Sequence, residues 1–312
     1  MRKMKWLGLL TALCMLCTGC GNADSTASSS AADADTQSSV AAPSGLNLVT
    51  LGDSISYGYG LDDPENERYS ALLTGMLEQS DNRKWNDYNY AVVGDNSSDL
   101  VYRLETGKAL RLPSADAVVV CIGANNILGV YTEFLQDTVY SYDIDFENAT
   151  DEELAALQEQ IMADMQDTET VMQELQTKID ENLVQLEADM EVIYTMIRDR
   201  NADAPIYVMN VYNPYRGEAE SVLPGLDEGD EDFGDFVQIQ LDRCNKILSD
   251  FVAEHDDLTA VDLAAAFAAV DPVPIIGAGD YGEDVEYLDP HPNADGQKLI
   301  ADTLFAVMRG DT

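Results

Sequence analysis

Basic residues are scarce in this chain of 312 residues. It contains 17 Lys and Arg against 58 Asp and Glu, which gives a formal net charge of -41. A surface this acidic repels polyanions, so nucleic acid is excluded as a partner and anionic lipid headgroups are disfavoured. The acidity carries no information about the fold, and its simplest consequence is solubility.

Histidine and cysteine are also few. The sequence has two histidines and five cysteines, and three of the cysteines precede residue 21. Cys121 lies in an apolar run and Cys244 in a helical pattern, so both are expected to be buried small hydrophobes rather than a disulfide. Two histidines and two dispersed cysteines make no metal-site spacing, which excludes a metallohydrolase, and no cofactor is expected.

The amino terminus has the pattern of a targeting segment. Basic residues at positions 2–5 precede an apolar run, residues 6–16, that is too short to span a bilayer. Thr18-Gly19-Cys20 follows and resembles the cleavage motif of bacterial lipoproteins, which implies removal of residues 1–19 and a lipid on Cys20. An ordinary signal peptide is the alternative. In the lipoprotein reading the protein lies outside the cytoplasm, anchored to the cell membrane only by this lipid.

Residues 20–44 contain mainly Ser, Ala, Asp, Thr and Gln, without hydrophobic periodicity. Such a segment cannot bury enough apolar surface to offset the entropy of ordering it. We therefore expect a disordered tether, followed by one folded domain over residues 45–312.

Three apolar runs in the domain each lead into a short polar motif. Leu48–Leu51 precedes Gly52-Asp53-Ser54, the run 85–93 ends at Gly94, and Ala117–Ile122 precedes Gly123-Ala124-Asn125-Asn126. A serine after a buried parallel strand points into the crevice where open α/β sheets bind ligands. Each motif alone is weak, because glycine after a strand is an ordinary turn signal.

A fourth motif lies near the carboxyl terminus, where His291 stands between two prolines before a helical pattern. Together and in this order, the four motifs resemble those of the SGNH (GDSL) hydrolases, over residues 47 to about 309. The resemblance implies that Ser54 is the nucleophile and His291 its base. It also implies an oxyanion hole formed by the backbone N–H groups of Ser54 and Gly94 and by the side-chain amide of Asn125. Asn126 stands where the family usually has Asp.

The acid that orients His291 is the main departure from the family pattern. The family places an acid three residues before the histidine, but Leu288 occupies that position. Asp289, two residues before, is the preferred candidate, followed by Glu286 and then by a dyad without an acid. The second histidine, His255, lies at a polar helix end and is expected to be exposed.

Two more strands are predicted at 205–211 and 258–262, and helices at 65–79, at 97–104 with Ser97 or Ser98 as N-cap, and at 233–253. Five strands that alternate with helices predict a parallel α/β/α three-layer sandwich. The resemblance implies the flavodoxin-like form of this fold, with a helical insertion after the third strand.

Residues 128–200 exceed the compact family pattern. Thr150 and Glu153 form a capping-box pattern, and the apolar spacing then continues to residue 200. One helix of that length would be roughly 75 Å long, whereas a globule of this size is about 45–50 Å across. A break is therefore predicted near residues 166–170. The interpretations are two packed helices, a cap over the site from residues 128–166 with a crossover helix after it, or a coiled-coil dimer; a monomer is preferred.

The function that follows is a membrane-tethered serine esterase that acts on an acylated glycan, a lipid or a small ester. Lysophospholipase or thioesterase activity is the alternative within the family. A non-catalytic surface module that binds glycan or a partner is the alternative outside it, because the acid is displaced. The sequence indicates neither the acyl chain length nor the alcohol.

Overall fold

The computed structural model describes residues 45–130, 168–217, 233–276 and 289–310, with short stretches at 133–134, 141–142, 149–150, 152–154, 156–157 and 160. The predicted signal segment and tether at residues 1–44 lie outside the described residues. So does most of the proposed cap at 128–166.

Five parallel strands form one sheet at the centre of the molecule. They are β1 (Leu46–Gly52), β2 (Trp85–Asn89), β3 (Ala117–Cys121), β4 (Ile206–Met209) and β5 (Leu258–Val261). Their order is β2-β1-β3-β4-β5, and every neighbouring pair is parallel. The predicted strand count and parallel arrangement are confirmed.

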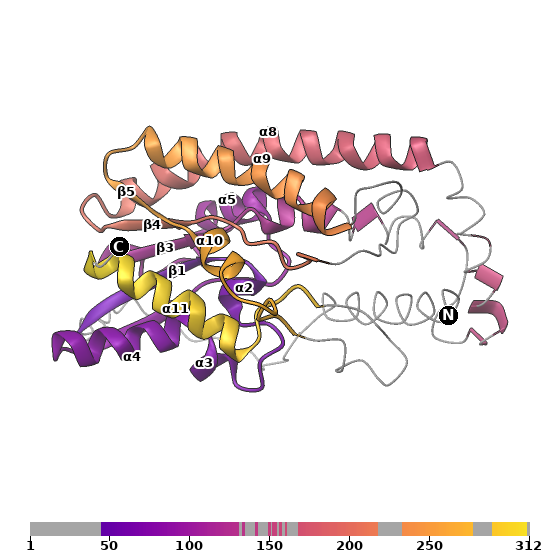
Figure 1. Ribbon diagram of the computed structural model, residues 1–312. Helices are drawn as coiled ribbons and strands as arrows, with labels where there is room; N and C mark the ends of the chain where they lie inside the picture. Colours follow the sequence, from indigo (N-terminus) through magenta and orange to yellow (C-terminus); the bar gives the residue numbers. More distant parts are fainter. Residues whose placement is uncertain are drawn as a thin grey trace, which may run out of the picture.

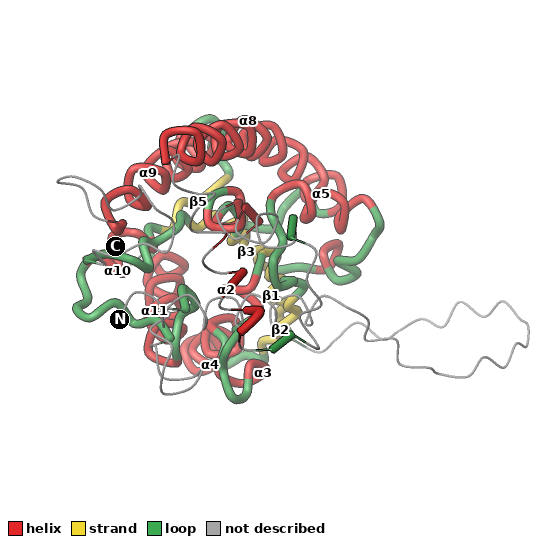
Figure 2. The backbone as a smooth tube through the Cα atoms, turned by 90° about the vertical axis from the view of Figure 1, so that its right-hand side faces the viewer, coloured by secondary structure: helices red, strands yellow, loops and turns green. Residues whose placement is uncertain are grey.

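Helices cover both faces of the sheet, as the predicted sandwich requires (Figures 1 and 2). The described helices are α2 (Ser54–Tyr57), α3 (Pro64–Glu67), α4 (Tyr69–Asp81), α5 (Ser97–Glu105), α8 (Thr168–Arg200), α9 (Phe233–Ala253), α10 (Leu263–Ala268) and α11 (Ala294–Arg309), with single 3₁₀ turns η1 (Leu112–Ser114) and η2 (Ala124–Asn126). Helices α4 and α11 lie on one side of the sheet, and α5, α8 and α9 lie on the other. Among these described helices, none combines the length and the apolar character needed to cross a membrane.

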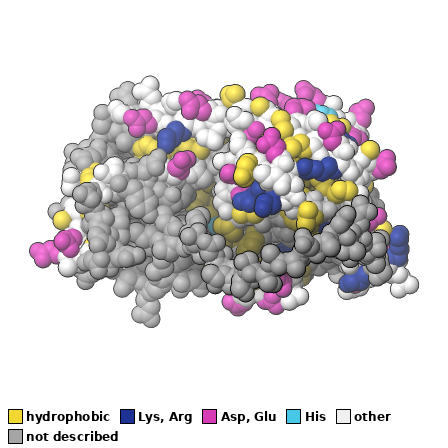
Figure 3. Space-filling view, turned by 180° about the vertical axis from the view of Figure 1, so that it is seen from behind, with side chains coloured by type: hydrophobic (Ala, Val, Ile, Leu, Met, Phe, Trp, Pro, Cys, Tyr) yellow, Lys and Arg dark blue, Asp and Glu magenta, His cyan; other side chains and the backbone are white. Residues whose placement is uncertain are grey.

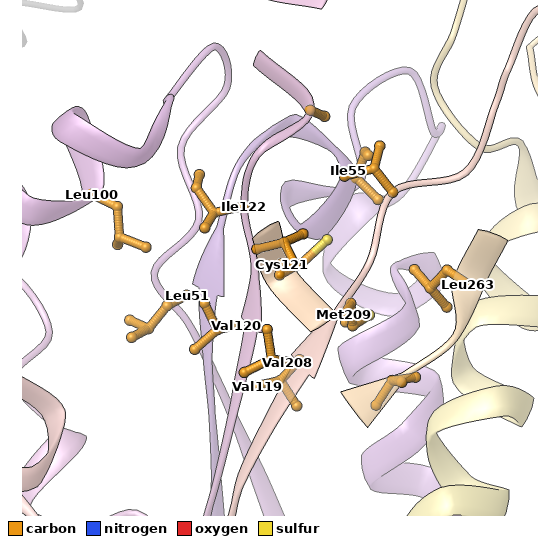
Figure 4. Packing of buried hydrophobic residues seen from close by; sticks show 14 of the residues in the cluster. Leu51, Ile55, Leu100, Val119, Val120, Cys121, Ile122, Val208, Met209 and Leu263 are labelled. Carbon is orange, nitrogen blue, oxygen red and sulfur yellow. The ribbon is translucent and has the colours of Figure 1, made fainter. Parts of the chain in front are cut away.

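The core lies between the sheet and these helices. The central strand β3 is buried along its whole length, as its uninterrupted apolar run predicts for a strand covered on both faces. Figure 4 shows side chains of β1, β3 and β4 with Leu100 of α5 to one side and Leu263 of α10 to the other. Cys121 and Cys244 are both buried and unpaired, as predicted.

Several predicted boundaries differ from the structure. The strands predicted at 205–211 and 258–262 are shorter, at Ile206–Met209 and Leu258–Val261. The strand predicted to reach Val93 ends at Asn89. The backbone N–H groups of Tyr90 and Val92 still donate to β1, but the chain then turns at Gly94, where the backbone is left-handed. Regular strand pairing between β2 and β1 therefore ends at Asn89, although the apolar pattern of the sequence continues to Val93.

The helix predicted over residues 65–79 is two helices, α3 and α4, separated at Arg68. Arg68 has an extended backbone, and its guanidinium pairs with Asp87 of β2. The N-cap of α5 is Asn96, not Ser97 or Ser98. Its side chain accepts from two backbone N–H groups of the first turn, which leaves both serine hydroxyls available for other contacts.

Helix α8 supplies the outer layer beside α5 and α9 (Figure 1). Its 33 residues correspond to a length of about 50 Å. Its buried apolar side chains recur at three and four residues; they are Leu175, Ile179, Leu183, Leu186, Met190, Ile193 and Ile197. This apolar stripe packs within the molecule, which supports the crossover-helix interpretation for this part. The predicted capping box is confirmed, since Thr150 and Glu153 exchange hydrogen bonds, but the predicted break lies largely outside the described residues.

Where described residues form the face seen in the space-filling view, acidic side chains are scattered among other types (Figure 3).

Candidate active site

The serine turn is built by the residues around Ser54. Asp53 is the N-cap of α2, and its Oδ1 accepts a hydrogen bond from the Ile55 N–H at 2.9 Å. Ser54 follows as the first residue of α2 and is 6% exposed. The serine thus lies at the carboxyl end of β1, at the edge of the sheet where ligands bind in this architecture.

Gly52, the last residue of β1, allows this turn to lie close to β3. A Cβ atom at this position would lie 2.4 Å from the Cys121 carbonyl oxygen and 2.5 Å from Ser56 Oγ. Any side chain would push the serine turn away from the neighbouring strand. The glycine is therefore required by packing.

Gly94 is required for its backbone conformation instead. Its φ angle is +85°, and no heavy atom lies within 4 Å of the position of a Cβ atom. A left-handed turn here directs the chain from β2 toward α5 and leaves Gly94 exposed.

Asn125 lies in η2, directly after β3. Its Nδ2 donates to the carbonyl oxygen of Asp95 at 3.0 Å. An amide NH₂ group has two protons, so one remains available for another acceptor. This contact brings Asn125 beside the turn that contains Gly94, as the shared sheet edge predicts.

His291 and Asp289 form a close pair. Oδ1 of Asp289 lies 2.5 Å from Nδ1 of His291 and accepts the backbone N–H of the same residue at 2.9 Å. Asp289 is 3% exposed. A carboxylate that accepts the N–H two residues later forms an Asx turn, and this turn folds the acid back toward the ring. Glu286, the second candidate, lies outside the described residues.

The histidine loop is held on both sides. The Tyr212 hydroxyl donates to the Pro290 carbonyl oxygen at 2.7 Å, and the Ile276 N–H donates to the His291 carbonyl oxygen at 2.9 Å. Tyr212 is itself fixed by stacking on Phe267, with ring centroids 3.9 Å apart. The backbone around His291 is thereby restrained.

Tyr59 and Gln297 connect the histidine loop to the serine turn. The Tyr59 ring centroid lies 4.5 Å from that of His291, and the Tyr59 N–H donates to the Ser54 carbonyl oxygen at 3.1 Å. Gln297 of α11 donates from Nε2 to the Ile55 carbonyl oxygen at 3.0 Å. The structure therefore brings Ser54 and His291, 237 positions apart by number (291 minus 54), to the same edge of the sheet.

The carboxyl group of Asp53 is the most perturbed acid beside the serine. Burial raises its pKa from 3.8 to about 7, opposed by the hydrogen bond from the Ile55 N–H and by the charge of His291. Its second oxygen, Oδ2, is buried and has no hydrogen-bond partner among the described residues. Burial also raises the pKa of the nearby Cys121 thiol, and the charge of Asp53 adds to that effect.

His255 does not join this site. It lies two residues after the end of α9, where Nδ1 lies 2.8 Å from the Phe251 carbonyl oxygen and the ring packs on Tyr194 with centroids 4.2 Å apart. The side chain is only 16% exposed, so the prediction that it is exposed is wrong. Aromatic packing between α8 and α9 covers it. In the described part of the chain, no group of three or more His, Cys, Asp or Glu residues is arranged to hold a metal ion.

Several supporting residues were not predicted. Tyr59, Tyr212 and Gln297 belong to no motif. Only Gln297 offers a signal, because it is a polar residue on the buried face of an amphipathic helix; in the structure it is 0% exposed. Asn126 was noted only as a departure from the family. In the structure it is buried and bonds to Ser97 at the start of α5.

Comparisons with known proteins identify the family and the fold. The family model described as the GDSL-like Lipase/Acylhydrolase family matches residues 50–299. No curated protein matches the chain.

Three solved structures show the same fold. An extracellular lipase from Streptomyces rimosus has a TM-score of 0.51 at 19% identity, over 84% of this chain and 99% of its own. Phospholipase A1 from Streptomyces albidoflavus NA297 has a TM-score of 0.52 at 18% identity, and the match covers 86% of this chain and 100% of that protein. A variant of an acetyl-xylooligosaccharide esterase from Geobacillus Stearmophilus has a TM-score of 0.50 at 18% identity, and the match covers 85% of this chain and 94% of that protein.

Proposed function

The chain belongs to the GDSL-like lipase/acylhydrolase family, a family of ester-hydrolysing serine hydrolases, and from this premise we propose that Ser54, His291 and Asp289 form its catalytic triad. A serine hydroxyl is a weak nucleophile near neutral pH and needs an adjacent base. His291 takes the proton from Ser54 Oγ as the ester carbonyl is attacked, and returns it to the leaving alcohol. Water then releases the acid from the acyl-enzyme by the same route.

The observation that carries this proposal is the pairing of Asp289 with His291 Nδ1 at 2.5 Å. An acid at Nδ1 holds the proton of the ring on that nitrogen, which leaves Nε2 free to act as the base. It also stabilises the imidazolium that forms during the reaction. The non-catalytic alternative rested on the displaced acid, and the Asx turn supports the catalytic proposal because it brings that acid to the ring.

The proposed oxyanion hole consists of the N–H groups of Ser54 and Gly94 and the second amide proton of Asn125. A donor of this kind contributes about 3–4 kcal/mol when it meets the developing negative charge. The contact between Asn125 and the Asp95 carbonyl oxygen supports this role, because it fixes the amide before substrate arrives.

The proposed substrates are carboxylic esters: an acylated glycan, a lipid or a small ester. The solved relatives described as a lipase, a phospholipase and an acetyl-xylooligosaccharide esterase motivate this range. Lysophospholipase or thioesterase activity is the alternative within the same chemistry. We also propose, from the sequence of the amino terminus alone, that Cys20 carries a lipid anchor and that the domain acts outside the cytoplasm.

The test uses a fluorophosphonate probe and a panel of esters. The panel contains acetyl, butyryl and long-chain esters, acetylated xylan, acetylated peptidoglycan and a lysophospholipid. The natural chain is expected to be labelled and to hydrolyse at least one ester, whereas Ser54→Ala loses both activities with its fold intact. Ser249→Ala removes an exposed hydroxyl from α9 and is the matched control. Undiminished labelling of Ser54→Ala would remove Ser54 from the mechanism.

A further inference from the structure

A carboxylate on α8 holds the first turn of α5. Ser97 Oγ and Ser98 Oγ each donate to Oδ2 of Asp189 at 2.7 Å, and Gln185 Nε2 donates to Oδ1 at 2.8 Å. Asp189 is 5% exposed. Among the described residues no Lys or Arg pairs with it, so three neutral donors stabilise its charge. The amino terminus of α5 adds to that stabilisation, because a helix N-terminus favours negative charge.

Asn126 contacts the same serine from the other side. Its Oδ1 accepts the Ser97 N–H at 3.1 Å, and its Nδ2 donates to Ser97 Oγ at 2.8 Å. Ser97 Oγ has one proton, and because this oxygen accepts from Asn126 it donates that proton to Asp189. Each hydrogen bond from Asn126 through Ser97 to Asp189 therefore donates toward the carboxylate, because Asp189 can only accept.

These bonds connect two of the three segments that carry the proposed oxyanion donors, those of Gly94 and Asn125. Asn126 is next to Asn125, and Ser97 is three residues after Gly94. Helix α8 contacts the Asn125 loop directly as well, because Asn126 Nδ2 lies 3.3 Å from the Asn182 carbonyl oxygen. Both loops are thus hydrogen-bonded to α8, which holds them at a fixed distance from each other.

We propose that Asp189 is a positioning residue for the oxyanion hole, acting through Ser97 and Asn126 on Gly94 and Asn125. This inference rests on the proposed function of the site. Without the carboxylate, the Ser97 hydroxyl loses its acceptor and the first turn of α5 is free to shift relative to η2. A misplacement of about 1 Å can reduce a rate by about 100-fold. The effect falls on the transition state, where the oxyanion forms, and not on substrate binding.

The experiment measures labelling by a fluorophosphonate probe, because phosphonylation of the serine places negative charge on an oxygen in the same hole. The rate constant at saturation and the half-saturating probe concentration are determined for the full chain and for Asp189→Ala. The rate constant is expected to fall roughly 10–100-fold, with the half-saturating concentration within about two-fold. A purely structural role would reduce the amplitude of labelling and leave the rate constant unchanged, and that result would overturn the inference.

Two further variants keep the test decisive. If Asp189→Ala does not fold, Ser97→Ala breaks the same link while Asp189 keeps its bond to Ser98, and an unchanged rate constant there overturns the inference. Asp81→Asn is the matched control. Asp81 accepts from Trp85 Nε1 at 2.9 Å, at the start of β2 and therefore at the opposite edge of the sheet. Its rate constant is expected to stay unchanged.

The outcomes separate this inference from the proposed function. If the natural chain is not labelled, or Ser54→Ala is labelled equally well, the proposed function fails and the inference fails with it. If labelling depends on Ser54 but Asp189→Ala and Ser97→Ala both react at the natural rate, only the positioning role is rejected.

Discussion

Asp289 contacts His291 twice through a single oxygen, Oδ1, which lies 2.9 Å from the backbone nitrogen and 2.5 Å from Nδ1. The backbone bond closes a local turn, and the turn aims the carboxylate at the ring. An acid two residues before the histidine thus reaches Nδ1 without a longer loop. The contact explains how the motif around His291 can work although its acid stands two residues before the histidine and not three.

Replacement of this acid tests its role directly. Asp289→Asn keeps the size of the side chain but presents an amide that can stabilise the wrong tautomer of His291. We expect kcat to fall by about 10³–10⁴. Glu286→Gln is the comparison and is expected to retain activity. Full activity of Asp289→Asn on any ester that the natural chain hydrolyses would reject the assignment.

Asn125→Ala tests the oxyanion donor. The variant loses the amide that Asp95 holds in place, so the expected loss is roughly 10²–10³ in kcat with little change in KM. The measurement is a saturation curve for the best ester of the panel. A change confined to KM would instead make Asn125 a residue that binds the substrate in its ground state.

The Asp53 carboxyl predicts a pH dependence of stability. Its pKa is about 7 in the folded chain, against an ordinary value of 3.8. Between these values the folded state binds more protons than the unfolded state, so this group makes the free energy of unfolding fall as pH rises from about 4 to about 7.

Asp53→Asn removes this ionisation and can retain the Oδ1 acceptor for the Ile55 N–H. The variant is expected to gain stability relative to the natural chain as pH rises through this window, by up to about 4 kcal/mol above pH 7. Urea unfolding at pH 4, 5.5, 7 and 8 measures the difference. A stability difference that does not vary with pH would contradict the prediction.

Gln297 provides a test of the link between α11 and the serine turn. Its side chain is fully buried, donates to the Ile55 carbonyl oxygen and accepts the Tyr69 N–H at 2.8 Å. Gln297→Leu leaves both backbone groups unsatisfied and is expected to cost about 2–4 kcal/mol in the free energy of unfolding. Lys298→Leu, at an exposed position of the same helix, is the control with an expected effect below about 1 kcal/mol. Equal effects of the two variants would show that the buried bonds do not stabilise the fold.

Cys20→Ser tests the proposed anchor. The natural chain is expected in the membrane fraction of bacterial cells, and the variant is expected to be released from it, because serine offers no thiol for the lipid. Detection by immunoblot of the two fractions is sufficient. A variant that remains with the membrane would indicate another attachment.

The sequence by itself determined the sheet and the residues proposed for catalysis. A strand buried on both faces has to be an uninterrupted apolar run, so Val118, Val119 and Val120 predicted β3 without any contact information. Parallel strands place their carboxyl ends at one edge, so the motifs after β1, β2 and β3 were expected together. The roles of the site residues came from the resemblance of these motifs, in this order, to those of the SGNH (GDSL) hydrolases.

Only the tertiary structure decided how these residues are held. Asp189, Gln297 and Tyr212 are far in sequence from the groups that they contact, and no local pattern encodes a hydrogen bond between distant segments. The reach of Asp289 to His291 depended on a turn whose backbone angles the spacing alone does not specify. A burial pattern along the chain predicts which face of an element is covered. The partner of a buried polar group is determined by which other segment packs there, and that exists only in the folded chain.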